Sequence, residues 1–200
     1  DANNPDADFK VLQAREKDLK YGLDHYGDDF YLRTNLNAEN YKLVKTPISA
    51  TSKDNWVDVI PHRKEIFFQG FELFEDYLVL TERKNGLREL RVKSWDDNQD
   101  YYLDFKDPTY IAYSSQNLDF DTNLLRYGYA SLTTPNTVYE FNMKTKEQTV
   151  LKQDEIMGGD FSSENYISER LFATADDGTK VPISLVYRKG LEKNGNNPLL

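Results

Sequence analysis

Short stretches with apolar side chains at every second position run through most of the chain. This alternation places one face of a strand on a core, and it occurs in residues 30–33, 90–93, 138–143 and 181–187. Residues 77–80, Tyr-Leu-Val-Leu, are apolar at every position instead, as expected of a strand buried on both faces. No stretch shows a long helical period. The pattern therefore predicts an all-β protein.

Two pairs of residues have the composition of tight hairpin turns. Asn85-Gly86 and Asp177-Gly178 supply the positive φ angles that two-residue β-turns require. The second pair lies between the segments 166–175 and 180–188, which we expect to form one long hairpin.

The predicted strands repeat along the chain. FYLRT at residues 30–34 is echoed by YLVLT at 77–81 and more loosely by LRYGY at 125–129. Each follows a short apolar segment, at 21–24, 71–74 and 118–121, and each precedes a strand-like segment, at 41–46, 87–92 and 138–143. A repeat of about 47 residues with four strands per unit is typical of β-propeller blades. We therefore expect Thr34 and Thr81 at matching places in adjacent blades.

Three such units account for residues 9 to about 156, whereas propellers close with four to eight blades. We therefore expect a partial β-propeller of about three four-stranded antiparallel blades over residues 1–158, within a longer protein. The pattern changes at Met157-Gly158-Gly159. Residues 159–200 are predicted to form a separate unit, the hairpin followed by a polar loop. Val181, Ile183, Leu185 and Tyr187 form an apolar stripe on one face of its second strand.

Composition narrows the function classes. Aromatic residues make up 14% of the chain, with 14 Tyr and 11 Phe, which favours strands. The net charge is −9 and the basic residues are dispersed, so nucleic acid is an improbable partner. An acidic protein attracts cationic ligands, although solubility alone also explains this charge.

The absence of Cys excludes disulfides and thiolate zinc sites. No apolar run reaches the roughly 20 residues of a membrane span, and the polar first residues do not resemble a signal peptide.

Candidate catalytic residues are few. Ser131 follows Gly128-Tyr129-Ala130, but the G-x-S-x-G motif of a nucleophile elbow is missing. His25 is predicted in a turn between two strands, and His62 follows Pro61 in a connection between blades. Neither histidine has a serine fixed beside it by a motif. We therefore predict structural roles for all three residues and no catalytic, cofactor or metal site.

Carboxylates occur in three groups: Asp24, Asp28 and Asp29; Asp96, Asp97 and Asp100; and Asp119 with Asp121, expected on one strand. Paired acids about 5 to 9 Å apart can hydrolyse glycosides, so a propeller glycosidase is one alternative. Most of these residues flank predicted turns, where Asp forms local hydrogen bonds. The oxygen-rich residues 1–8 lack the glycine and closing Glu of a calcium loop.

Several stretches resemble the oligopeptidase B group of the prolyl oligopeptidase family of serine peptidases. The most specific are YGYASLTTPNTVYEFNM from Tyr127 and YISERLFATADDGTKVPISLVYRKG from Tyr166. Similar stretches begin at Tyr21, Asn55 and Phe71, so the resemblance covers almost the whole chain.

The resemblance implies a seven-bladed propeller that limits access to an α/β-hydrolase domain, with cleavage after Lys or Arg. Residues 166–188 resemble the first hairpin of that hydrolase domain. The family's catalytic Ser, Asp and His lie beyond this hairpin, so the present chain would be a non-catalytic part of a cytoplasmic enzyme. Its partners would be short basic peptides, without cofactor, nucleic acid or membrane. Self-association through exposed blade faces or the 166–188 hairpin is also expected. The second hypothesis is an autonomous propeller that serves as an interaction module.

Overall fold

The computed structural model describes residues 4–96, 98–159 and 161–199. These residues form strands joined by turns and two three-residue 3-10 helices, Lys53–Asn55 and Ser163–Asn165. The strands are β1 (Tyr21–Tyr26), β2 (Asp29–Thr34), β3 (Lys42–Pro47), β4 (Val57–Ile60), β5 (Ile66–Leu73), β6 (Tyr77–Lys84), β7 (Leu87–Ser94), β8 (Asp100–Tyr102), β9 (Tyr110–Ser114), β10 (Leu124–Ser131), β11 (Thr137–Asn142), β12 (Gln148–Gln153), β13 (Tyr166–Thr174) and β14 (Lys180–Arg188).

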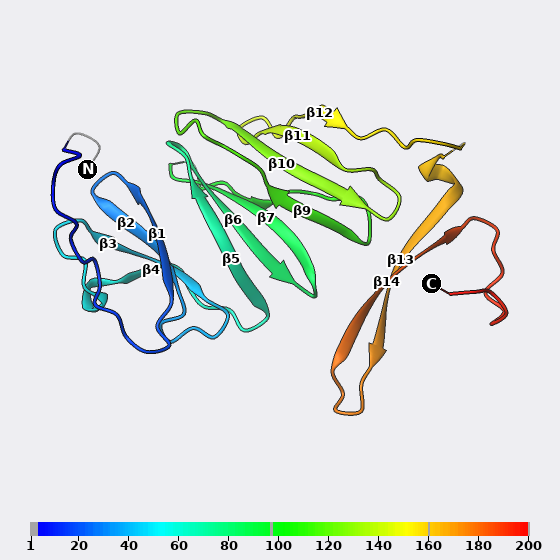
Figure 1. The fold of residues 1–200 in the computed structure, drawn as a ribbon, viewed down its shortest axis with the longest axis horizontal. Helices are drawn as coiled ribbons and strands as arrows, with labels where there is room; N and C mark the ends of the chain where they lie inside the picture. The colour runs from blue at the N-terminus through cyan, green and yellow to red at the C-terminus, as the bar shows by residue number, and fades with distance from the viewer. Residues whose placement is uncertain (1–3, 97, 160, 200) are drawn as a thin grey trace.

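The first twelve strands form three consecutive four-stranded sheets, each with its strands in chain order. All pairings within them are antiparallel. The sheets lie side by side as an open stack (Figure 1). We call β1–β4, β5–β8 and β9–β12 the first, second and third blades. The sequence prediction of an all-β, unclosed partial propeller is confirmed.

The sequence repeat corresponds to strand position within each blade. FYLRT, YLVLT and LRYGY lie on β2, β6 and β10, the second strand of each blade. Thr34 ends β2, and Thr81 is the fifth residue of β6. Residues 118–121 depart from the prediction. They lie in the connection between β9 and β10, so Asp119 and Asp121 are loop residues and not neighbours on a strand.

Strand β6 is buried on both faces, as its continuous apolar sequence predicts. Leu78 and Leu80 belong to the core between the first and second blades. Tyr77 and Val79 belong to the core that the second blade shares with the third. Because side chains alternate along a strand, this single strand supplies both inter-blade cores.

A buried carboxylate joins the second blade to the connection that precedes it. Glu82 of β6 is fully buried. Its carboxylate accepts hydrogen bonds from the Arg63 guanidinium and from the Tyr102 hydroxyl at 2.7 Å, and Arg91 Nη1 lies 3.7 Å away. A buried charge is tolerated only when it is paired and hydrogen-bonded, and these three residues meet that requirement.

Strands β13 and β14 pair only with each other in the described structure, and their hairpin projects from the blade stack (Figure 1). The apolar stripe predicted from the sequence is largely uncovered. Val181 is 45% exposed and Ile183 is 43% exposed, and Leu171 on the partner strand is 45% exposed. The hairpin therefore packs weakly on the blades.

Candidate functional site

The side chain of Tyr26 contacts all three blades. This residue ends β1, and its ring stacks on Trp95 with centroids 5.4 Å apart and lies 5.5 Å from the ring of Phe120. Its hydroxyl donates to the carbonyl of Glu75 at 2.8 Å. The amide of Glu75 in turn donates to the carbonyl of Phe120 at 3.0 Å. We call Tyr26, Trp95 and Phe120 the aromatic junction.

Local structure explains why these residues meet. Tyr26, Glu75 and Trp95 flank the β1–β2, β5–β6 and β7–β8 connections, which lie at the same end of their blades because the strands alternate in direction. The β9–β10 connection is fixed by Asn117, which donates to Glu72 at 2.8 Å and accepts from the amide of Arg126 at 2.7 Å. That loop brings Phe120 to the junction.

Carboxylates surround the aromatic junction. Burial raises the pKa of Tyr26, and the negative charges of Asp96, Glu75 and Asp76 raise it further. A hydrogen bond with Asp121, together with the charge of that carboxylate, raises the pKa of Glu75. Within residues 4–96, 98–159 and 161–199, no Lys or Arg forms an ion pair with any of these four acids. The site therefore combines unneutralised negative charge with aromatic rings, the two features that attract organic cations.

The acids predicted from the sequence have different environments. Asp29 pairs with Lys45 at 2.7 Å, and Asp100 pairs with Arg91 at 2.6 Å and also with Lys93. Asp24 accepts from the amide of the adjacent His25 at 2.8 Å. The backbone carbonyl of Asp28 accepts a hydrogen bond from the amide of Ile48 at 3.0 Å. The carboxylates of Asp29 and Asp100 are thus neutralised, and that of Asp24 bonds to the local backbone.

The remaining predicted acids lie in or near the β7–β8 and β9–β10 connections. Asp96 and Asp121 reach the junction, and Asp119 lines a neighbouring hollow with Arg126 and Glu140. Asp97 lies outside the described residues. Sequence reasoning missed Glu75 and Asp76, although their place between two predicted strands of the second repeat was a usable signal. It also missed the contacts of Tyr26 with Trp95 and Phe120, because these residues are far apart in the sequence and no local motif connects them.

Ser131 has a structural role. Its Oγ accepts hydrogen bonds from the amides of Thr133 and Thr134 at 3.1 and 2.9 Å, which closes the β10–β11 turn. The neighbouring Asp107 carboxylate accepts from Tyr129 at 2.5 Å and from both threonine hydroxyls, at 3.4 and 3.1 Å. These hydrogen bonds account for the Ser and Thr residues of the sequence SLTTP, residues 131–135, which forms the turn.

The histidines are not paired with Ser131 in the described structure. His25 belongs to β1 and not to a turn as predicted, and its ring lies 5.6 Å from that of Phe30. Nε2 of His62 accepts from the amide of Asn40 at 3.3 Å, in the predicted connection between blades. A serine nucleophile requires a base within hydrogen-bonding reach, and neither histidine supplies one.

The Glu75–Asp121 pair does not match a glycosidase. The two carboxyl groups interact directly, which raises the pKa of Glu75, whereas glycoside hydrolysis uses carboxyl groups about 5 to 9 Å apart across a sugar ring. For metals, the described residues contain no group of three or more His, Asp or Glu that could hold an ion. The oxygen-rich start of the chain lies partly outside the described residues, because residues 1–3 are not among them.

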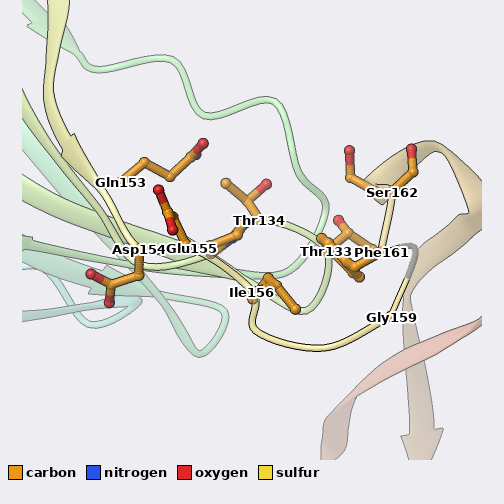
Figure 2. A pocket seen from close by; sticks show the side chains of 11 residues that line it. Thr133, Thr134, Gln153, Asp154, Glu155, Ile156, Gly159, Phe161 and Ser162 are labelled. Atoms are coloured by element: carbon orange, nitrogen blue, oxygen red, sulfur yellow. The ribbon is translucent and has the colours of Figure 1, made fainter.

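A separate hollow of about 600 Å³ lies between the SLTTP turn and the segment that leads to the hairpin. Figure 2 shows the carboxylates of Asp154 and Glu155 and the hydroxyls of Thr134 and Ser162 around it. Its lining contains no His. The hollow therefore offers polar groups that can bind a ligand, but no histidine that could act as a general base. No helix in the described parts of the chain is long and apolar enough to span a bilayer.

Comparison with known proteins supports the fold assignment. Residues 1–154 match the family model described as prolyl oligopeptidase, N-terminal beta-propeller domain. Dipeptidyl aminopeptidase BI of Pseudoxanthomonas mexicana is 44% identical over 194 residues, covering 96% of this chain and 26% of that protein. Protease 2 of Moraxella lacunata is 29% identical over 200 residues, covering 100% and 28%. The chain thus spans about a quarter of the length of these relatives.

Solved structures agree with these sequence matches. Oligopeptidase B from Trypanosoma brucei, in a closed form with covalently bound antipain, superimposes with a TM-score of 0.81 and 34% identity, over 91% of this chain and 27% of that one. Oligopeptidase B from Leishmania major gives a TM-score of 0.82 and 29% identity, over 92% and 27%. The family match and the open stack of four-stranded blades lead to one conclusion: the chain belongs to the prolyl oligopeptidase family and carries part of its β-propeller.

Proposed function

We propose that this chain is the non-catalytic, propeller-bearing part of a serine oligopeptidase that cleaves short peptides after Lys or Arg. In this proposal the propeller restricts which peptides reach the active site. The observation that carries it is the aromatic junction, where Glu75, Asp76, Asp96 and Asp121 lie without ion-pair partners in the described structure. Relatives named protease, peptidase and oligopeptidase support the peptidase assignment.

The junction favours basic peptides for two physical reasons. Clustered carboxylates raise the local concentration of cations and so accelerate their encounter with the protein. Phe120, which is 43% exposed at the junction, then offers an aromatic ring over which a guanidinium or ammonium group gains further stabilisation. The overall charge of −9 acts in the same direction. A peptide with Glu in place of Lys or Arg meets repulsion instead.

The hairpin fits the same proposal. In the family, this segment opens the α/β-hydrolase domain that holds the serine, histidine and aspartate. Leu171, Val181 and Ile183 present an apolar face that the described residues leave exposed. Exposed apolar surface of this kind marks an interface, and we assign it to the remainder of the hydrolase domain.

A second candidate function is an interaction module. The observation that favours it is the apolar surface on the two outer blades, where Leu23 and Val57 of the first blade are 46% and 61% exposed and Ile111 of the third is 50% exposed. A three-bladed stack has two open sides, and each can accept another protein.

Peptide binding tests the first candidate. The chain is titrated with a fluorescent peptide that contains two Arg residues and with its Glu counterpart. We expect binding of the Arg peptide only, and affinity about five-fold weaker in the Glu75→Gln/Asp121→Asn variant, as expected for partly exposed charge pairs. The matched control is Glu39→Gln/Asp54→Asn, which removes two exposed acids elsewhere in the first blade. Equal affinity of the two double variants would reject the proposed site.

A further inference from the structure

The two faces of the β13–β14 hairpin have different surroundings. Register pairs Arg170 with Ser184 and Phe172 with Pro182, so these residues share one face with Ser168, because side chains at i and i+2 lie on the same side of a strand. Val181, Ile183, Leu185 and Tyr187 occupy the other face. The face that carries Ser168 and Arg170 contacts the blades, and the apolar stripe lies on the other face.

Arg170 makes the contact with the second blade. Its Nη2 donates a hydrogen bond to the backbone carbonyl of Asn85, in the turn between β6 and β7. Nη1 lies 3.5 Å from Oγ of Ser184 within the hairpin. The guanidinium thus bridges the hairpin and the turn with a planar array of donors, a geometry that an ammonium group cannot reproduce.

Gly86 in the same turn is required for this contact. Its φ is +80°, which favours glycine. A Cβ atom on Gly86 would also lie 2.8 Å from Nη2 of Arg170 and 3.2 Å from Cγ of Pro182. A side chain at position 86 would therefore push the Arg170 guanidinium from its place on the turn and crowd the ring of Pro182.

A second contact joins the hairpin to the third blade. Oγ of Ser168 and Oγ1 of Thr109 lie 2.8 Å apart, and Thr109 is only 3% exposed. Ser168 and Arg170 are on the same face of β13. Two contacts on one strand, one to each blade, define the angle at which the hairpin leaves the stack.

The Arg170 contact is not arranged for maximum stability. Nε of Arg170 is buried and has no hydrogen-bond partner among the described residues, and a buried unsatisfied donor is costly. The guanidinium nevertheless lies on the Asn85-Gly86 turn, where Nη2 donates to the carbonyl of Asn85. A contact that keeps one donor unsatisfied fits a residue that fixes the orientation of the hairpin more than it stabilises the fold.

We propose that Arg170 is a positioning residue whose guanidinium, held on the Asn85-Gly86 turn, sets the tilt of the hairpin over the second and third blades. Through the hairpin, Arg170 also places the residues that follow Arg188. The inference goes beyond the proposed function, because it holds whatever peptide the protein receives.

The test measures a distance across the contact. The chain has no Cys, so Lys144→Cys in the β11–β12 turn and Asp176→Cys at the hairpin tip, both exposed, give two unique sites for spin labels. Pulsed electron resonance then reports the distribution of their separation. We expect one narrow distribution in the starting protein, a shifted and broadened one in Arg170→Ala and Gly86→Ala, and a smaller shift in Arg170→Lys.

Gly27→Ala is the matched control. Gly27 also has positive φ, +60°, in a blade turn, but a Cβ atom added there would meet nothing within 4 Å. Its distribution should equal that of the starting protein. The urea midpoint of the blades should not change in Arg170→Ala, which separates positioning from folding. If Gly86→Ala fails to fold, the two Arg170 variants decide alone. An unchanged distribution in Arg170→Ala would overturn the proposal.

Discussion

The ring of Tyr26 stacks on the ring of Trp95 at an interplanar angle of 17°, and this contact joins the first blade to the second. Phe120 of the third blade lies against the same tyrosine. Three segments that are far apart in the sequence therefore meet at one side chain. The carboxylates of Glu75, Asp76 and Asp96 act on that side chain and raise its pKa, so the packing of the blades and the proposed recognition of cations depend on the same residues.

Tyr26→Ala should destabilise the chain by about 2 to 3 kcal/mol, because it removes a half-buried ring with three aromatic neighbours, Tyr31, Trp95 and Phe120. Tyr26→Phe keeps the stacking and loses only the hydrogen bond to the Glu75 carbonyl, which costs about 1 kcal/mol. Urea unfolding followed by fluorescence measures both. Equal midpoints for the alanine variant and the starting protein would show that the junction does not hold the blades together.

Glu82→Gln should be more damaging than the same change at Glu89, a half-buried acid on the neighbouring strand. It leaves Arg63 and Arg91 without their common buried partner, and breaking a buried pair costs about 3 to 5 kcal/mol. Glu89→Gln is the control, because Glu89 faces Glu82 across the β6–β7 pair and burial raises its pKa. Neutralising Glu89 should cost little, and a loss as large as that of Glu82→Gln would contradict the proposed role of the buried pair.

Asp100 should make stability depend on pH in the acid range. Burial disfavours its charged form, but hydrogen bonds from Arg91 and Lys93 outweigh burial and lower its pKa. A folded-state pKa below the unfolded value, about 3.9 for Asp, means that Asp100 stabilises the fold fully above that value. This stabilisation is lost as the pH falls through the lowered pKa. Urea midpoints between neutral and acid pH should fall less steeply in Asp100→Asn, and parallel curves would oppose this prediction.

The hairpin stripe should promote self-association of the chain. Light scattering across a concentration series should show a rising average mass, because Leu171, Val181 and Ile183 present uncovered apolar surface. Ile183→Lys should reduce this rise, whereas Thr179→Lys, in the exposed turn of the hairpin, should not. A strictly monomeric protein at all concentrations would exclude association through this surface.

The repeat and the Asn85-Gly86 turn were readable from the sequence because they depend on local chemistry. The second predicted turn differs: five residues, 175–179, join β13 to β14, and of Asp177-Gly178 only the glycine has a positive φ. FYLRT, YLVLT and LRYGY carry their period in consecutive residues, and Asn85-Gly86 requires φ values that few residues adopt. The aromatic junction was not predictable in this way. The contact of Tyr26 with Phe120 depends on how the β9–β10 connection folds back across the blades, and its residues Asp119 and Asp121 alternate as a strand would.

Buried charge was the other feature that the sequence concealed. Glu82 follows the apolar residues 77–80 in β6. The alternation of side chains along the strand therefore predicts that Glu82 lies where the buried part of the strand ends. Its burial depends on Arg63 from the preceding connection and on Tyr102 from β8. Pairing between such distant positions is set by tertiary structure and leaves no local pattern.

Recognition of peptides without their cleavage is the central property proposed for this chain. The most direct measurement is the hydrolysis of a fluorogenic peptide with two basic residues by the purified chain. We predict no activity in the protein peak, because Ser131 closes a turn and neither His25 nor His62 contacts it in the described structure. Activity that follows the protein peak and is lost in Ser131→Ala would contradict the claim.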